Sequence, residues 1–258
     1  MSDDLVALSV LVVSDSASER DALKEAAANA SVMIDLSEVD RISEASATCN
    51  VLASKNVDVI FLDSRMPHEG RQAVIDAAHA ADATPLVISI GSSDLKPNQS
   101  AERLAIDGLL AKPFQSDEAR SLLDACMRAR LRSRILVVDD SATVRSVIRK
   151  VLQSCRYQFE VEEADDGMAA LGQADKQRYD LVLLDCHMPG LDGFATLAKF
   201  LETHADAKVV MVTATNDTKV ADRARAAGAH DVLYKPFYAK DIDAVMNRIH
   251  GLTQPKVQ

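Results

Sequence analysis

Residues 181–189 read Leu-Val-Leu-Leu-Asp-Cys-His-Met-Pro, an apolar run that ends in an aspartate and a short polar turn. The same pattern occurs earlier in the chain, in Leu62-Asp63-Ser64-Arg65-Met66-Pro67. Two further pairs accompany it: Val12-Val13-Ser14-Asp15-Ser16 with Val137-Val138-Asp139-Asp140-Ser141, and Ala111-Lys112-Pro113-Phe114 with Tyr234-Lys235-Pro236-Phe237. The paired aspartates and lysines stand 122 to 125 positions apart. This separation predicts one domain of ordinary size that has been duplicated, because solenoid repeats are much shorter.

Each half of the chain alternates short aliphatic runs with helical patterns. In the second half, strand-like runs cover 135–139, 159–163, 180–184, 208–213 and 231–234. Runs that are apolar at almost every position are typical of strands covered on both faces. After the first run, Ser141 is a plausible helix cap, and Val144, Val147, Ile148, Val151 and Leu152 recur at the spacing of one helix face.

Five strand-and-helix units in each half predict an α/β fold with two doubly wound, five-stranded parallel sheets in tandem. We place the first domain at 5–131 and the second at 133–252. The first half has a short fourth helix at about 98–105, after Pro97, and a last helix at about 116–131.

The overall composition restricts the function classes. The chain has 258 residues and a formal net charge of −10, which argues against nucleic acid or an anionic membrane as a partner, because these need a basic surface. No apolar run reaches the roughly 18 residues that cross a bilayer. The four cysteines show no metal or disulfide spacing. We therefore expect a cytoplasmic protein with reduced thiols and no membrane insertion.

Polar residues stand where the strands of the second half are expected to end. They are Asp139 and Asp140 after the first strand, Asp185 after the third, Thr213 after the fourth and Lys235 after the fifth. In a parallel sheet these strand ends meet at one edge, where ligands bind. Three neighbouring carboxylates repel one another unless a cation intervenes, and an oxygen-only ligand set favours Mg²⁺. With Mg²⁺ present, Asp185 can attack phosphorus and form an acyl phosphate, while Lys235 neutralises phosphoryl charge.

At these residues the second half, about 133–250, resembles the receiver domains of two-component response regulators, especially the chemotaxis type. The matching stretches are Asp-Asp-Ser-Ala-Thr at 139–143, Leu-Leu-Asp-Cys-His-Met-Pro-Gly-Leu-Asp-Gly-Phe at 183–194 and Tyr-Lys-Pro-Phe at 234–237. The resemblance implies a flavodoxin-like receiver fold with strand order 2-1-3-4-5. It also implies phosphorylation by a histidine kinase or a histidine phosphotransfer protein.

The resemblance also implies roles for individual residues. Asp185 is the implied phosphoacceptor. The implied Mg²⁺ ligands are Asp140, Asp185 and the carbonyl of His187, with Asp139 in support. Thr213 and Lys235 are the implied pair that contacts the phosphoryl group.

Two features of the second half depart from the family or stay open. The family usually has Tyr or Phe three residues before the lysine, where this chain has Val232. Tyr234 lies on the same face of that strand at a different height, so the output is expected to use other means, such as helix movement or dimerisation. His187 either tunes the lifetime of the phosphoryl group or is simply exposed.

The first half, 5–124, resembles a receiver less completely. Asp15, Asp63 and Lys112 occupy matching positions, and they form a possible vestigial site that holds Mg²⁺ weakly. Ser14 replaces the first acidic residue, and we assign Ile90 to the position of the phosphate-binding hydroxyl. Leu109 replaces the aromatic residue. We favour a pseudo-receiver with an interaction role over a second phosphorylation site.

Three functions follow from these patterns. The first is a response regulator without a DNA-binding output domain, in which phosphorylation of Asp185 controls binding to a downstream protein or self-association as a homodimer; it is not an enzyme. The second is the regulatory fragment of a larger enzyme such as a cyclic-di-nucleotide synthase, since tandem receivers precede such domains in one known architecture. The third, a haloacid-dehalogenase-type phosphatase, needs Asp-x-Asp after the first strand; the adjacent pair Asp139-Asp140 disfavours it.

Overall fold

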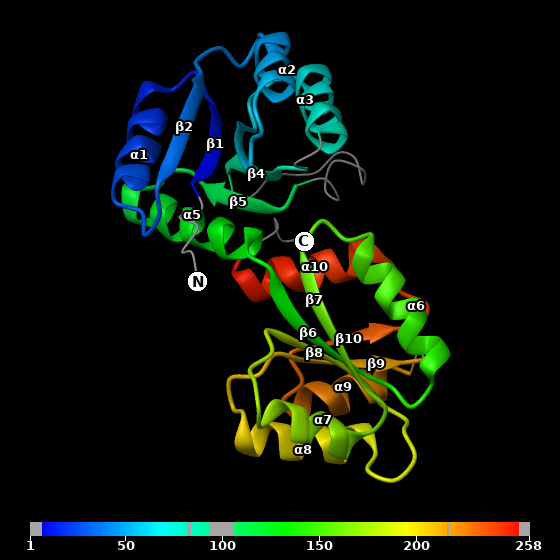
Figure 1. Ribbon diagram of the computed structural model, residues 1–258. Helices are drawn as coiled ribbons and strands as arrows, with labels where there is room; N and C mark the ends of the chain where they lie inside the picture. The colour runs from blue at the N-terminus through cyan, green and yellow to red at the C-terminus, as the bar shows by residue number, and fades with distance from the viewer. Residues whose placement is uncertain (1–6, 82–83, 93–105, 216, 253–258) are drawn as a thin grey trace. The chain divides into compact units, whose positions relative to one another are not determined.

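The computed structural model describes residues 7–81, 84–92, 106–215 and 217–252. The chain divides into two compact units (Figure 1). The first unit runs to Arg130 and the second begins at Leu131, while the residues from Asn247 onward are grouped with the first unit.

The first unit contains a five-stranded parallel sheet in the order β2-β1-β3-β4-β5. Its described strands are β1 (Leu8–Val13), β2 (Ile34–Val39), β3 (Val59–Asp63), β4 (Leu86–Gly91) and β5 (Gly108–Ala111). Its described helices are α1 (Ala17–Ala28), α2 (Ala45–Ser54), α3 (His68–Ala80) and α5 (Ser116–Arg130). The fourth helix that we expected at about 98–105 lies outside the described residues.

The second unit repeats this sheet, with five parallel strands in the order β10-β9-β8-β6-β7. Its strands are β6 (Ser133–Val138), β7 (Phe159–Ala164), β8 (Leu181–Asp185), β9 (Val209–Thr213) and β10 (Asp231–Tyr234). Its helices are α6 (Ala142–Gln153), α7 (Gly167–Ala174), α8 (Gly193–Thr203), α9 (Thr218–Ala226) and α10 (Ala239–His250), of which α10 belongs to this unit up to Met246. The predicted tandem α/β fold with strand order 2-1-3-4-5 is confirmed.

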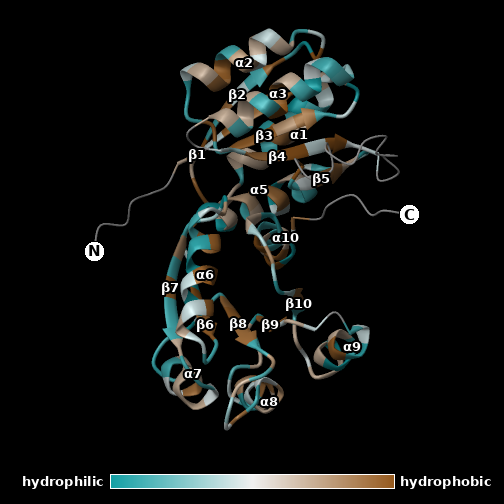
Figure 2. Ribbon diagram, turned by 90° about the vertical axis from the view of Figure 1, so that its right-hand side faces the viewer, coloured by the Kyte–Doolittle hydropathy of each residue, from teal (hydrophilic) through white to brown (hydrophobic). Residues whose placement is uncertain are grey.

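The central strands explain why these sequences form two-sided sheets. Every residue of β3, β4, β8 and β9 is buried, and Figure 2 shows β4 and β8 in the colours of hydrophobic residues. Such strands need a helix layer on each face to exclude water. Within the described residues, no helix is long and apolar enough to cross a membrane.

Helix α6 shows how far the hydrophobic pattern predicts burial. Its N-cap is Ser141, as predicted, and the side chain of Ser141 accepts a hydrogen bond from the backbone N–H of Val144. Ile148 and Leu152 are buried against the sheet, but Val147 is 55% exposed. The predicted apolar face was therefore too wide, because the side that packs is the one with Ile148 and Leu152, and Val147 lies at the opposite edge.

Candidate functional site

The site of the second unit is organised around the ammonium group of Lys235. This residue directly follows β10, and its Nζ donates hydrogen bonds to Asp139 Oδ2 and to Asp185 Oδ1, both at 2.7 Å. Asp139 directly follows β6, and Asp185 is the last residue of β8. Both aspartates are buried. Strands β6, β8 and β10 thus bring together three of the predicted residues at the carboxyl edge of the sheet, with β9 lying between β8 and β10.

The charge of Lys235 is maintained by these two contacts. Burial alone lowers the pKa of its ammonium group, but the hydrogen bonds to Asp139 and Asp185 outweigh that effect and raise the pKa above its ordinary value. The ammonium group therefore stays protonated at neutral pH. It offsets part of the repulsion between the two carboxylates.

The turns after β6 and β8 hold the two buried carboxylates in place. The backbone N–H of Ser141 donates to Asp139 Oδ1 at 2.9 Å, and the backbone N–H of His187 donates to Asp185 Oδ2 at 2.8 Å. Each carboxylate therefore has one oxygen on Lys235 and the other on a backbone amide. This arrangement fixes the direction of Asp185 at the sheet edge.

The residues of the predicted Mg²⁺ ligand set are Asp139, Asp140, Asp185 and His187, and all four stand at the end of β6 or β8. Within the described ranges, no three His, Cys, Asp or Glu side chains converge closely enough to hold a metal ion. Lys235 lies between Asp139 and Asp185, and the side chain of Asp140 is exposed; the ligand predicted from His187 is its backbone carbonyl. The donors still fit Mg²⁺ chemically, because two buried carboxylates and an adjacent exposed one form an oxygen-rich edge.

Thr213 ends β9 at the same edge and is fully buried. Its Oγ1 accepts a hydrogen bond from the backbone N–H of Thr215 at 3.2 Å. Burial raises the pKa of the neighbouring Cys186 thiol to about 11, with a contribution from Asp185, although a hydrogen bond with Thr213 opposes the rise. The structure places Thr213 beside Cys186. The backbone N–H of Lys235 donates to the backbone oxygen of Thr213 at 2.7 Å, and in the described part of the chain no hydrogen bond joins the Thr213 hydroxyl to Asp185 or Lys235.

Gly193 at the start of α8 passes directly behind Asp185. A Cβ atom at this position would lie 2.1 Å from the backbone oxygen of Asp185 and 2.9 Å from Cα of Cys186. No side chain fits there without movement of the backbone. The sequence signal was present in the stretch from Gly190 to Phe194, but only the structure shows that the glycine permits close packing against the candidate phosphoacceptor.

An arginine clamp that the sequence reasoning missed supports the loop after β6. Arg145 on α6 donates from Nη1 to the backbone oxygen of Asp139 at 2.7 Å, and its Nε lies 2.9 Å from Glu163. The first unit repeats the contact, because Arg20 on α1 donates from Nη1 to the backbone oxygen of Ser14 at 2.7 Å. The signal that would have found the clamp is the duplication itself, which places these arginines at equivalent positions.

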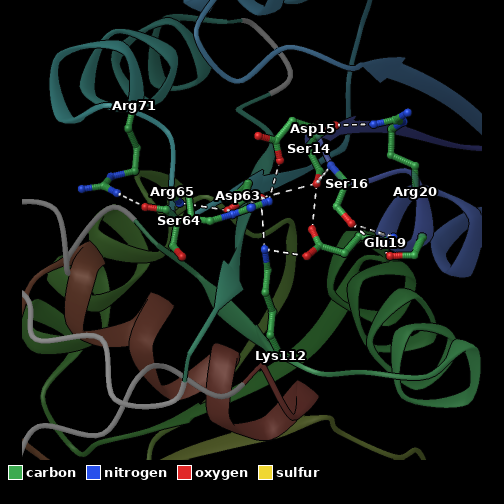
Figure 3. Close-up of polar contacts among 11 residues, drawn as sticks. Ser14, Asp15, Ser16, Glu19, Arg20, Asp63, Ser64, Arg65, Arg71 and Lys112 are labelled. Atoms are coloured by element: carbon green, nitrogen blue, oxygen red, sulfur yellow. Dashed lines mark hydrogen bonds and ion pairs between the residues drawn. The ribbon is translucent and has the colours of Figure 1, made fainter.

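The corresponding pocket of the first unit contains a different set of ion pairs (Figure 3). Asp63, the last residue of β3, is fully buried, and Lys112 donates to its Oδ2 at 3.0 Å. Arg65 donates to the same oxygen at 2.6 Å from Nη2, and the same Nη2 contacts Asp15 Oδ1 at 2.5 Å. Glu19 on α1 forms an ion pair with Lys112, and its Oε1 lies 2.7 Å from Nζ of the lysine. The vestigial residues Asp15, Asp63 and Lys112 are thus brought together.

Arg65 and Glu19 are the members of this pocket that the sequence reasoning missed. Arg65 stands two residues after Asp63, the position that His187 has after Asp185. Glu19 lies on α1, and its Oε2 accepts a hydrogen bond from Ser14 Oγ at 2.7 Å. A carboxylate on the helix thereby replaces the one that is lost at Ser14.

The strand register corrects one sequence assignment in the first unit. Ile90 pairs with Asp63, as Val212 pairs with Asp185. Gly91 pairs with Ala111, as Thr213 pairs with Tyr234. The residue equivalent to Thr213 is therefore Gly91, and the assignment of Ile90 was wrong by one position. A one-residue shift reverses the face of the sheet, so Ile90 and Gly91 lie on opposite faces of β4. The position still lacks a hydroxyl.

The position three residues before each lysine holds an aliphatic residue in both units. Val232 is buried and contacts the core of the second unit, while Tyr234 is half-buried and packs against the same core. Leu109 in β5 is half-buried as well. The departure from the usual aromatic residue is thus a property of both sheets.

Comparison with known proteins gives one sequence-family match, to the response regulator receiver domain, over residues 135–247. The chemotaxis protein CheY of Bacillus subtilis is 33% identical over 115 residues, which cover 45% of this chain and 95% of that protein. The cyclic di-GMP phosphodiesterase response regulator RpfG of Xanthomonas campestris is 32% identical over 129 residues, 49% of this chain and 34% of RpfG. This chain therefore spans about a third of RpfG.

Solved structures that resemble nearly the whole chain are among the matches. One of them is described as a probable two-component system response regulator/GGDEF domain protein, with a TM-score of 0.52 and 18% identity over 94% of this chain and 97% of that one. At this identity the likeness shows the fold alone. It extends over both units, whereas the family match lies in the second.

Proposed function

Because this chain belongs to the response regulator receiver family through its second unit, we propose that phosphorylation of Asp185 controls how the chain binds another protein. The observation that carries the proposal is the contact of Lys235 with both Asp139 and Asp185 at 2.7 Å. Receiver domains bind Mg²⁺ at their phosphorylation site and are phosphorylated by histidine kinases or phosphotransfer proteins. We place the two domains at 5–131 and 133–252, and the protein in the cytoplasm.

Asp185 is the nucleophile in the proposed transfer. A carboxylate oxygen of Asp185 forms a bond to phosphorus, the bond from phosphorus to the donor's imidazole nitrogen breaks, and the electron pair returns to the imidazole. The amide of His187 and the ammonium group of Lys235 hold the carboxylate in one orientation before the donor arrives. Transfer then needs no rotation of the Asp185 side chain.

Asp139, Asp140 and Asp185, with the carbonyl of His187, would hold Mg²⁺. The metal supplies positive charge that neutralises the phosphoryl oxygens and screens the three carboxylates from one another. Lys235 would exchange one of its two carboxylate contacts for a phosphoryl oxygen. Because its ammonium group stays charged, it adds electrostatic stabilisation in a partly dry pocket.

Thr213 is the proposed sensor of the phosphoryl group. Its hydroxyl lies at the sheet edge, beside Cys186 and one strand away from Asp185. Turning the hydroxyl toward a phosphoryl oxygen would release the hydrogen bond from Thr215. Since Thr215 precedes α9, this exchange would change the start of that helix. We propose that α9, β10 and α10 form the surface that a downstream protein or a second copy recognises.

Labelling with a small phosphodonor tests the proposal. Acetyl phosphate with Mg²⁺ should add one phosphoryl group to the chain, measured by intact mass, and gel filtration of the labelled protein reports self-association. Asp185→Asn should abolish labelling, and Asp63→Asn should leave most of it. If the Asp185→Asn variant labels as fast as the wild type, the assignment of Asp185 is wrong.

A second candidate function is that the chain is the regulatory part of a larger enzyme of cyclic-dinucleotide metabolism. It is supported by the response regulator/GGDEF protein, whose fold matches 94% of this chain, and by the match to RpfG over a third of that phosphodiesterase. In this case phosphorylated Asp185 would change the activity of an attached domain. The two candidates differ in one measurement, because only the second predicts that the complete gene product makes or hydrolyses a cyclic dinucleotide.

A further inference from the structure

In the first unit, the loop after β3 carries Arg65, and its guanidinium group contacts the carboxylates of Asp63 and Asp15. Arg65 Nε lies 3.2 Å from both carboxylate oxygens of Asp63, and Nη2 lies 2.6 Å from Oδ2 (Figure 3). The same Nη2 contacts Asp15 Oδ1 at 2.5 Å. One planar cation therefore joins the carboxylates that correspond to Asp185 and Asp140 of the second unit. Guanidinium groups suit this role, because their donors match a carboxylate in a fixed geometry.

One backbone hydrogen bond at Arg65 has a counterpart in the second unit, although the turn before the next helix is shorter, at 64–67 against 186–192. The backbone N–H of Arg65 donates to Asp63 Oδ1 at 2.9 Å, as that of His187 donates to Asp185 Oδ2 at 2.8 Å. The side chain of His187 is exposed, and the cation that contacts the carboxylate of Asp185 is Lys235. The residue two positions after the aspartate thus decides whether the pocket contains a second cation.

The ionisation of Asp63 agrees with a permanently paired carboxylate. Its burial alone raises the pKa of the carboxyl group, but the hydrogen bonds from Arg65 and Lys112 outweigh that effect and hold the pKa below its ordinary value. Lys112 has a second carboxylate partner in Glu19. Every charged group in this pocket therefore has an opposite charge beside it without a metal ion.

We propose that Arg65 is a built-in cation that takes the place of a divalent metal in the first unit, and that it masks Asp63 from phosphodonors. Asp15 and Asp63 retain the oxygen donors of a metal site, and Arg65 occupies both. Removing the guanidinium group should uncover a latent Mg²⁺ site. This inference concerns the first unit, so it stands or falls independently of phosphorylation at Asp185.

The wild-type full chain gives the first test, with Mg²⁺ alone as the probe and backbone amide shifts as the readout. Saturable shifts should appear around Asp139 and Asp185 at concentrations that leave the amides around Asp15 and Asp63 unchanged. Saturation around Asp63 at the same concentrations would overturn the proposal without any variant. Failure at Asp185 alone would count against the proposed function and leave this inference standing.

Variants of Arg65 give the second test. Arg65→Ser should produce saturable Mg²⁺-dependent shifts at Asp15 and Asp63, with an affinity raised on the order of tenfold or more, since one partly buried charge pair is removed. Arg65→Lys keeps the charge and should resist Mg²⁺ nearly as well as the wild type. The matched control is Arg41→Gln, which removes an exposed arginine paired with Glu44 and should leave the shifts as in wild type. A folded Arg65→Ser variant that gains no Mg²⁺ binding at these residues would refute the proposal.

Discussion

The two pockets of this chain hold three carboxylates each and differ by one cation. In the second unit the ammonium group of Lys235 contacts Asp139 and Asp185, and Asp140 stands exposed beside them. In the first unit the carboxylates of Asp15, Glu19 and Asp63 are joined by Lys112 and by Arg65. The second pocket thus keeps a formal charge of −2 among these groups and the first only −1. The same sheet edge can attract a divalent ion or satisfy its own charges, according to which side chain follows the aspartate.

The largest expected effect is on the rate of phosphorylation, and it should differ between substitutions of Lys235 and of Lys112. Lys235→Met should lower the rate of phosphorylation by acetyl phosphate by roughly two to three orders of magnitude, because it removes a preorganised positive charge from the transferring group. Lys112→Met makes the same change in the first unit and should leave the labelling rate nearly unchanged. Initial rates from intact mass at fixed Mg²⁺ give the comparison. Equal losses in both variants would mean that both pockets react.

A smaller effect concerns the stability of each unit without metal. Asp63→Asn takes a carboxylate from two cations at once and leaves Arg65 with Asp15 and Lys112 with Glu19. The free energy of unfolding of the first unit should fall by about 2 kcal/mol, less than for a fully buried pair because Arg65 is half exposed. Asp185→Asn should change the second unit by no more than about 1 kcal/mol, because Lys235 keeps its contact with Asp139.

Hydrogen exchange of slowly exchanging amides in β1 and β6 measures the two units separately. Asp58→Asn removes a carboxylate paired with Arg130 in the first unit and keeps one oxygen that can accept the hydrogen bond from the backbone N–H of Ser9 in β1. It is therefore a control for the loss of an ordinary ion pair, read from the amides of β1 other than Ser9. If Asp63→Asn costs no more than this control, the cations around Asp63 do not stabilise the fold.

These contrasts also show what the sequence can and cannot predict. Asp185, Thr213 and Lys235 were predictable because a buried strand carries its last residue to the sheet edge whatever the details of packing. Arg65 was not predictable, because the direction of a long side chain in a loop depends on partners from other strands. The assignment of Ile90 in place of Gly91 failed for a similar reason, since only the pairing of neighbouring strands fixes a register to one residue.

The smallest effect is a difference between the wild type and Asp63→Asn in how steeply the stability of the first unit falls at low pH. The pKa of Asp63 in the folded chain is below its ordinary value, so its ionised form contributes stability above the unfolded pKa of about 4. That contribution is lost as the pH falls through the folded pKa. Below about pH 4 the first unit of the wild type should therefore lose stability more steeply than that of Asp63→Asn. Parallel acid-unfolding curves would show that the pairing of Asp63 does not depend on its charge.

The most direct test of the whole account is a titration of the full chain with Mg²⁺ and beryllofluoride, a mimic of the phosphoryl group, followed by backbone amide shifts in both units. Because Arg65 already pairs with Asp15 and Asp63 in the first pocket, whereas the second pocket has one cation fewer, saturable shifts should be confined to the second unit and centre on Asp185, Thr213 and Lys235. Comparable saturation around Asp63 and Lys112 would contradict the account.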